Sequence, residues 1–246
     1  MSSKLFAVVS GARAGIGRAA ALRFAKTYPV AIVAPGPESY QDTLTEINQA
    51  GGKAVGVTAD VTDSCSIDLA FQYIQMKLPG MKLAAAVYNA PFSHTLKPFL
   101  ELNSIDLQNS LTNNVKGIFQ FAQKTIPLLL EAVPESEYPP TLIITGATSS
   151  IRGTATNGAL AAGMFGRRAL AQSLAREFHP RGVHVAHTIF DGTIDKSVMK
   201  ELPINGNVED DKLNPEAIAE AYWYLHSQPR STFTHELDLR PYVQRF

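Results

Sequence analysis

Short apolar runs rich in Val, Ile and Ala recur along the chain, separated by stretches with helical periodicity. This alternation is typical of repeated βα units around a buried parallel sheet. Strands are predicted at Leu5 to Ser10, Val30 to Ala34, Ala54 to Thr58, Leu83 to Tyr88, Leu142 to Thr145, His184 to Ile189 and Glu236 to Leu239. Helices are predicted at Ile16 to Lys26, Ser39 to Ala50, Ser64 to Leu78, Leu107 to Glu131, Ala159 to Phe178 and Pro215 to Ser227. The sequence therefore predicts an α/β fold, a doubly wound, seven-stranded parallel sheet with helices on both faces.

The chain is long enough to bury one large core. It has 246 residues, of which 45% are hydrophobic, and no linker divides it. We therefore expect a single domain over residues 1–246. The segment from about Asp191 to Leu213 lacks strong periodicity and contains Gly192, Pro203 and Gly206. Loops of this length are often functional, so it is predicted to be a substrate lid, with a disordered connection as the alternative.

Charge and cysteine content narrow the expected partners. Lys and Arg number 22 and Asp and Glu also number 22, so the net charge is +0. This balance favours neither nucleic acid nor a membrane surface as a partner, and a small-molecule substrate is expected instead. The single cysteine, Cys65, cannot form an internal disulfide, and a cytoplasmic location is expected. No Cys/His cluster has metal-ligand spacing, so no metal site is predicted.

A glycine-rich turn follows the first predicted strand. The stretch "SGARAGIGRAA" places Gly11, Gly15 and Gly17 between that strand and the next helix. Glycines there let the backbone approach a pyrophosphate, which the N–H groups and positive end of the helix attract. Glycines needed only for packing are the alternative. The strand–turn–helix context favours dinucleotide binding.

The "GARAGIG" spacing resembles the short-chain dehydrogenase/reductase family, which has a Rossmann-type sheet. "ADVTD" at residues 59–63, "YNAP" at residues 88–91, "NNVKGIF" and "REFHPRGVHVAHTIFDG" are similar to further family segments. Asp60 stands where relatives bind adenine, and Asp191 stands where they usually have proline before Gly192. The resemblance implies a nicotinamide cofactor. It also implies the cofactor-binding residues Gly11, Arg13, Gly15, Ile16, Gly17, Asp60, Val61, Asn89, Ala90, Gly192 and Ile194.

The sequence gives a weak signal for the choice between NAD and NADP. A carboxylate at the end of the second strand normally holds a ribose diol, and an arginine there or in the glycine loop accepts a 2′-phosphate. Pro35 and Gly36 stand at that strand end. Arg13 is the basic residue of the glycine loop, and Arg18 lies one turn into the helix. The sequence therefore favours NADP, although a solvated Arg13 is an equal alternative.

The catalytic residues that the family resemblance implies are missing. Family members use a serine, a tyrosine and a lysine four residues after the tyrosine. Aligned on "ALAQSLAREF", these positions fall on Ala147, Leu160 and Met164. A second register starts at Ser150 and reaches Gly163 and Arg167, again without tyrosine. No lysine lies between Lys124 and Lys196, and no tyrosine between Tyr138 and Tyr222, so no local shift restores the set.

Other polar residues are candidates for the remaining chemistry. Asn114 corresponds to a structural and proton-relay asparagine of the family. Thr148 and Ser149 follow the fifth strand, where a hydroxyl can orient a substrate oxygen or else cap the loop. Asp191 follows the sixth strand, where a carboxylate can steady a cation, act as a base, or serve only as a turn residue. His94 and His187 are weaker candidates because a lone histidine is more often structural.

Three functions are consistent with this sequence. The preferred one is an NAD(P)-dependent oxidoreductase with a rebuilt active site, transferring hydride to or from a small organic molecule that needs no tyrosine acid, such as an iminium or another activated acceptor. The second is a non-catalytic nucleotide-binding protein with a regulatory or scaffold role. The third is a non-redox isomerase, cyclase or eliminating enzyme in the same pocket. In relatives the helix at residues 159–178 also packs between subunits, which implies a homo-dimer or homo-tetramer.

Overall fold

The computed structural model describes residues 4–90, 95–195, 205 and 208–245. In that part of the chain, seven parallel strands form one sheet in the order β3-β2-β1-β4-β5-β6-β7. The strands are β1 (Leu5–Ser10), β2 (Val30–Ala34), β3 (Ala54–Thr58), β4 (Lys82–Tyr88), β5 (Thr141–Thr145), β6 (His184–Phe190) and β7 (Glu236–Leu239). The strand order reverses between β1 and β4, and ligands of such sheets bind outside the strand carboxyl ends at this switch point.

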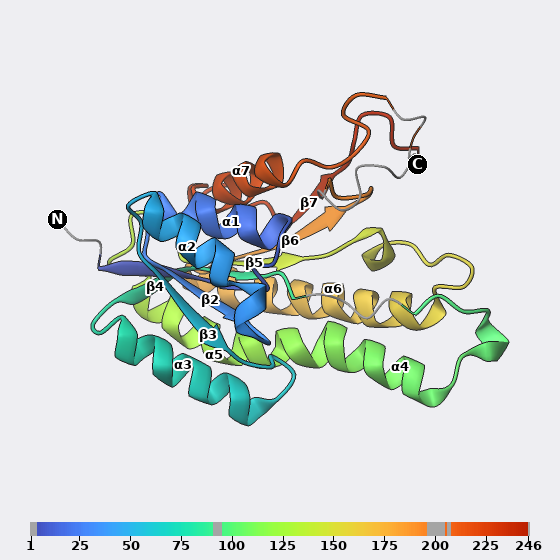
Figure 1. Cartoon of the computed structure of the whole chain (residues 1–246), viewed down its shortest axis with the longest axis horizontal. Coiled ribbons are helices and arrows are strands. Elements are labelled where there is room, and N and C mark those ends of the chain that lie inside the picture. The colour runs from blue at the N-terminus through green and yellow to red at the C-terminus, as the bar shows by residue number, and fades with distance from the viewer. Residues whose placement is uncertain (1–3, 91–94, 196–204, 206–207, 246) are drawn as a thin grey trace.

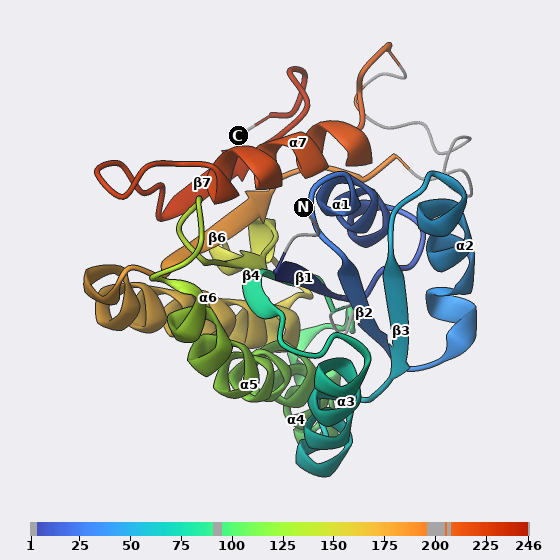
Figure 2. The same cartoon turned by 90° about the vertical axis from the view of Figure 1, so that its left-hand side faces the viewer.

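Helices cover both faces of the sheet (Figures 1 and 2). One layer contains α1 (Ile16–Ala25), α2 (Gln41–Gln49) and α7 (Pro215–His226). The other contains α3 (Ser64–Lys77), α4 (Ser104–Leu111), α5 (Gly117–Ala132) and α6 (Gly158–Phe178). Alternate residues of β1 supply the two cores: Phe6 and Val8 pack in one, and Ala7 and Val9 in the other. The predicted doubly wound fold is confirmed.

The predicted helix from Leu107 to Glu131 was wrong in two respects. The helical segment starts earlier, at Ser104, because Asn103 and Asp106 form a capping box at its beginning. A π-helical turn, Thr112–Lys116, then separates α4 from α5. Such turns insert one residue into the α-helical repeat and are frequent at functional sites. Apolar periodicity continues on both sides of the turn and so does not reveal it.

The base of the predicted lid is ordered. Ile194 pairs with Leu213 in a parallel bridge, and the Leu213 amide donates to the carbonyl of Thr193 at 2.8 Å. Gly192 has a φ of +155°, and a Cβ there would lie 2.7 Å from Pro241. Residues 196–204 and 206–207 of the predicted lid lie outside the described residues, as does His94. The described part shows that both ends of the segment are held beside β6.

Three buried histidines make the fold sensitive to acid. Burial lowers the pKa of His184 and of His187 to about 4, and that of His226 to about 3. In the unfolded chain, histidine binds its proton near pH 6.5, so below that pH the unfolded state holds more protons than the folded state. We expect the free energy of unfolding to fall between pH 6.5 and about 4, by up to ~1.4 kcal/mol per pH unit for each histidine. Urea denaturation at pH 7.5 and pH 5.0 measures this, and equal stabilities at the two values would contradict it.

Candidate active site

The glycine turn after β1 leaves no room for side chains. Gly11 and Gly15 have φ angles of +79° and +116°, which L-residues rarely adopt. A Cβ on Gly17 would lie 1.8 Å from the carbonyl oxygen of Gly11. The N-cap of α1, Gly15, provides no side-chain hydrogen bond. The turn is therefore a bare backbone cradle at a helix N-terminus, which is suited to bind a pyrophosphate.

Asn89 fixes the shape of this cradle. It follows β4, and its Nδ2 donates to the carbonyl oxygen of Gly11 at 2.8 Å. A Cβ on Gly11 would lie 2.5 Å from the carbonyl oxygen of Asn89, and the neighbouring Ala90 is buried. The structure thus brings the predicted residues of the β1 turn and the β4 end into direct contact at the switch point of the sheet.

Asp60 and Val61 lie beyond the end of β3. Asp60 is exposed, and its Oδ1 accepts hydrogen bonds from the amide and the hydroxyl of Thr62, both at 2.8 Å. This arrangement holds the carboxylate in place and leaves Oδ2 for another donor. Val61 is half-buried and lies beside Gly117. A Cβ added to Gly117 would lie 3.4 Å from Cγ2 of Val61.

The end of β2 carries a carboxylate that the sequence analysis missed. Glu38 folds back over Gly36, where a Cβ would lie 2.3 Å from both Glu38 carboxylate oxygens. Glu38 is exposed, and Ser39 donates to it at 3.5 Å. The sequence contained a signal for Glu38, because a ribose-binding acid is expected about 20 residues after the glycine motif. Glu38 lies four residues beyond the end of β2, whereas Pro35 and Gly36 follow the strand directly.

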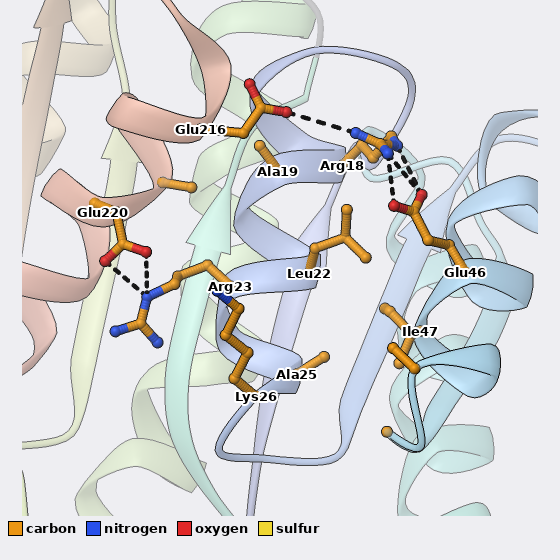
Figure 3. A pocket seen from close by; sticks show the side chains of 13 residues that line it. Arg18, Ala19, Leu22, Arg23, Ala25, Lys26, Glu46, Ile47, Glu216 and Glu220 are labelled. Carbon is orange, nitrogen blue, oxygen red and sulfur yellow. Dashed lines mark hydrogen bonds and ion pairs between the residues drawn. The ribbon is translucent and has the colours of Figure 1, made fainter.

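The two arginines near the glycine turn differ in their contacts. Arg13 is exposed, and within the described residues no carboxylate pairs with it. Arg18 instead forks onto Glu46 of α2 at 2.7 Å and reaches Glu216 of α7 at 3.7 Å (Figure 3). These contacts lie at a cavity of about 390 Å³ between α1, α2 and α7. Arg18 is therefore occupied in a bridge between helices.

The positions aligned with the family's tyrosine and lysine lie on one face of α6. Leu160 and Met164 are four residues apart and fully or almost fully buried, with exposed fractions of 2% and 0%. Ala147, aligned with the serine, follows β5 and is half-buried. Leu160 and Met164 are thus apolar core residues, and neither supplies a proton donor.

Thr148 and Asp191 are brought together although 43 residues separate them. The Thr148 hydroxyl donates to Asp191 Oδ1 at 2.7 Å and lies 3.3 Å from the carbonyl oxygen of Phe190. Arg240 reaches Asp191 Oδ2 at 3.2 Å, and Gln244 donates to Oδ1 at 3.5 Å. Asp191 is buried, and its carboxylate is held by residues from two other segments, the loop after β5 and the chain after β7.

The two serines after Thr148 differ. The hydroxyl of Ser150 is buried and accepts the amide of Ala147 at 3.2 Å, so it caps the loop. Ser149 is half-buried, and its hydroxyl has no hydrogen-bond partner among the described residues. Of the hydroxyls in this loop, that of Ser149 is the one available to a ligand.

Asn114 lies inside the molecule, in the π-helical turn. Its Nδ2 donates to Ser110 at 3.0 Å, and its Oδ1 accepts from Arg167 at 3.1 Å. The guanidinium of Arg167 also donates to the carbonyl oxygens of Asn114 and Thr145, at 3.1 and 2.9 Å. Arg167 is fully buried, and burial lowers its pKa. The side chain of Asn114 is thereby held in the core rather than in the crevice.

Arg167 and His187 complete the surroundings of the β5 end. Arg167 lies over the Tyr88 ring at 5.2 Å, and no carboxylate pairs with it within the described residues. His187 is buried in β6, and a Cβ on Gly146 would lie 2.3 Å from its Nε2. Both side chains are packed beneath the loop and away from solvent.

Together, the backbone cradle at the switch point and the hydroxyl and carboxylate groups at the ends of β5 and β6 define a dinucleotide-binding α/β protein. The comparisons with known proteins agree with this class. Residues 5–203 match the family described as short chain dehydrogenase. An uncharacterised oxidoreductase of Staphylococcus aureus (strain USA300) is 26% identical over 237 residues, covering 96% of each chain.

Two solved structures share the fold. The 3-ketoacyl-(acyl-carrier-protein) reductase from Brucella melitensis, complexed with NADH, has a TM-score of 0.82 and 22% identity, with 96% of this chain and 97% of that one covered. The alcohol dehydrogenase from Thermococcus sibiricus, complexed with 5-hydroxy-NADP, has a TM-score of 0.81 and 21% identity, with 98% of each chain covered. The protein belongs to the short chain dehydrogenase family, whose members are oxidoreductases. No helix in the described residues is long and apolar enough to span a membrane.

Proposed function

We propose that the protein is an NAD(P)-dependent oxidoreductase that transfers hydride to or from a small organic molecule without a tyrosine acid. The observation that carries this proposal is the cradle formed by Gly11, Gly17 and Asn89, because added side-chain atoms would collide with its backbone. The buried, apolar side chains of Leu160 and Met164 support hydride transfer without a tyrosine acid.

The residues at the crevice fit a nicotinamide dinucleotide. We assign the pyrophosphate to the backbone of Gly11, Gly15, Ile16 and Gly17, the adenine side to Asp60 and Val61, and the nicotinamide side to Asn89, Ala90, Gly192 and Ile194. When bound, the cofactor supplies or accepts the hydride. The protein positions the reacting partners and excludes water from them.

The missing acid restricts the substrate. General acid catalysis typically contributes ~10²–10⁴-fold, so an ordinary ketone lacks that acceleration here. An iminium carbon or another electron-poor acceptor takes hydride without a proton from the protein. Thr148 does not supply such a proton readily, because its hydroxyl already donates to Asp191. Ser149 remains to orient a polar substrate atom.

Fluorescence titration with NADPH and NADH, followed by an acceptor screen, tests this function. We expect micromolar binding and oxidation of the bound cofactor by cyclic imines at rates at least ~10²-fold above those with matched ketones. Binding without turnover by any acceptor would favour a non-catalytic nucleotide-binding protein. Failure to bind either cofactor would overturn the proposal.

We also propose a preference for NADPH that rests on Arg13. Arg13→Ala is expected to weaken NADPH binding about tenfold and to change NADH binding little, because one charge-assisted contact to the 2′-phosphate is lost. Glu38→Gln is expected to strengthen NADPH binding instead, because it removes a negative charge near the same ribose. Titration of both variants with both cofactors measures the change. Equal losses for NADPH and NADH in Arg13→Ala would contradict the assignment.

A second copy of this chain is the proposed macromolecular partner. A groove of about 590 Å³ along α4 and α5 is lined by Leu107, Leu111, Val115, Phe119 and Leu170. Leu107, Leu111 and Phe119 are exposed there, and Phe165 of α6 is exposed as well. An apolar face of this kind marks an association site. The family resemblance implies that α6 packs between subunits.

Charge on this face is expected to separate the subunits. The double variant Leu111→Asp/Phe119→Asp should sediment as a monomer in analytical ultracentrifugation, whereas the wild type should sediment as a dimer or tetramer, because the buried carboxylates would lack partners. Leu69→Asp, on an exposed position of α3, is the matched control and should leave the assembly unchanged. A monomeric wild type would contradict the proposal.

A further inference from the structure

β7 is an edge strand of the sheet (Figure 2). In the described part of the chain it pairs with β6 alone, and its four residues are half-buried or exposed. The amide of His187 donates to the carbonyl oxygen of His235 at 2.9 Å, and the amide of Asp191 donates to that of Leu239 at 3.0 Å. A short strand with little buried surface belongs to the low-stability end of a fold. β7 can therefore detach while the inner strands stay folded.

Four histidines gather where β7 joins β6. His184 and His187 belong to β6, His179 precedes that strand, and His235 precedes β7. The ring centroid of His179 lies 5.7 Å from that of His184 and 6.2 Å from that of His235. Phe233 stacks on the ring of His184 at 4.3 Å. Positive charges on rings packed this closely would repel one another, so the arrangement favours neutral rings.

His187 lacks partners for the two atoms that bind its proton. It has no exposed surface, and neither ring nitrogen forms a hydrogen bond within the described residues. The charged and titratable groups that face it are Glu236, whose Oε1 lies 3.5 Å from Nδ1, Arg167, Arg168 and His235. Arg168 already forks onto Glu236 at 2.6 and 2.8 Å, so this carboxylate is shared. Burial lowers the pKa of His187 to about 4.

His184 links β6 to α7 and to the segment before β7. Its Nδ1 lies 3.0 Å from the carbonyl oxygen of Leu225, and its Nε2 lies 2.8 Å from that of Thr234. A neutral ring has one N–H and donates to only one of these oxygens. A proton would supply the second donor, but burial outweighs this gain and lowers the pKa of His184 to about 4. The titratable groups that face His184 are His179, His235 and, from α7, His226.

We propose that residues 233–241, the β7 strap, are released by acid: protonation of His184 and His187 detaches the strap from β6 while the inner strands stay folded. In the detached state both rings gain access to water, where histidine binds its proton near pH 6.5. The detached state therefore binds more protons than the closed state below that pH. Between pH 6.5 and about 4, each ring raises the detachment constant by up to ~tenfold per pH unit.

Release of the strap would change the candidate active site. The strap ends in Arg240, which contacts Asp191 Oδ2 at 3.2 Å, and in Pro241, against which Gly192 packs. Detachment withdraws Arg240 from this carboxylate and uncovers the end of β6. Acid is thus expected to disturb the site before the whole protein unfolds. This inference does not depend on which reaction the site performs.

Hydrogen exchange of the full-length protein at pH 7.5 and 5.5, measured by mass spectrometry, tests the inference. Protection factors remove the intrinsic pH dependence of amide exchange. We expect protection of the strap to fall ~100-fold between the two pH values, because two rings each contribute about tenfold. At pH 5.5 the strap should be at least ~tenfold less protected than β1 and β4. This wild-type comparison does not require any variant to fold.

Two variants assign the effect to the strap histidines. In His187→Met, which fills the site without binding a proton, protection of the strap should fall only ~tenfold. His226→Gln is the matched control, because His226 is a buried histidine that contacts Tyr28 and Thr141 and not the strap. It should keep the ~100-fold fall. Equal protection of the strap, β1 and β4 at pH 5.5, or an undiminished fall in His187→Met, would overturn the inference.

Discussion

Gly17→Ala is expected to abolish cofactor binding, with a loss of affinity of at least ~100-fold. The added Cβ would lie 1.8 Å from the Gly11 carbonyl oxygen and 2.7 Å from Asn89 Nδ2. The first neighbour is backbone and cannot rotate away, so the turn must open and its N–H groups must leave the positions that a pyrophosphate needs. NADPH fluorescence titration measures the loss.

The matched control is Gly153→Ala. A Cβ at Gly153 meets nothing within 4 Å, and the residue lies in the loop after Arg152. We expect this variant to bind NADPH as the wild type does. Circular dichroism of Gly17→Ala separates a local opening of the turn from loss of the fold. A folded Gly17→Ala protein with wild-type affinity would show that the turn does not bind the cofactor.

Arg167→Met is expected to lower the free energy of unfolding by about 3–5 kcal/mol. The guanidinium donates to the carbonyl oxygens of Asn114 and Thr145 and to Asn114 Oδ1, all buried. Methionine fills much of the volume but leaves these acceptors without donors, and each such loss costs about 1–3 kcal/mol. Urea denaturation with the linear extrapolation measures the change.

Two further variants sharpen this result. Arg176→Met makes the same substitution at an exposed position of the same helix and should change stability by less than ~0.5 kcal/mol. Arg167→Lys should be intermediate, because an ammonium reaches fewer of the three acceptors. A change of under ~1 kcal/mol in Arg167→Met would mean that water replaces the lost donors.

The inner strands of the sheet could be predicted because they are buried on both faces, whereas the edge strands β3 and β7 are only partly buried. The run Val30–Ala34, for example, is apolar throughout and lies between Pro29 and Pro35, so its bounds are visible in the sequence. The break at Thr112–Lys116 was not visible, because a π-helical turn changes the register of the helix without changing its composition. Its stabilising partner, Arg167, lies more than 50 residues away in the sequence, so their contact depends on the tertiary fold.

The shape of the glycine turn could be predicted more easily than the contacts among polar residues at the ends of β5 and β6. Gly11 and Gly17 lie in a tight turn where a Cβ would collide with neighbouring backbone, so the sequence of the turn itself indicates their role. The contact between Thr148 and Asp191 depends on β5 and β6 being neighbours in register, and the position of Arg240 depends on the path of the chain after β7. The sequence analysis did not single out Glu38, because exposed charges are common and acquire meaning only from their place in the fold.

The packing of α6 limits how this protein can be engineered. A designer who wished to make it reduce ketones would install tyrosine at Leu160 and lysine at Met164. Met164 has no exposed surface, and a lysine there would lose its hydration and tend to shed its proton, since burial can lower a lysine pKa by ~3–5 units. Laboratory evolution toward ketone reduction would first have to loosen the neighbours of α6. A proton donor at Ser149 would require less repacking, because Ser149 lies on a loop and is already partly exposed.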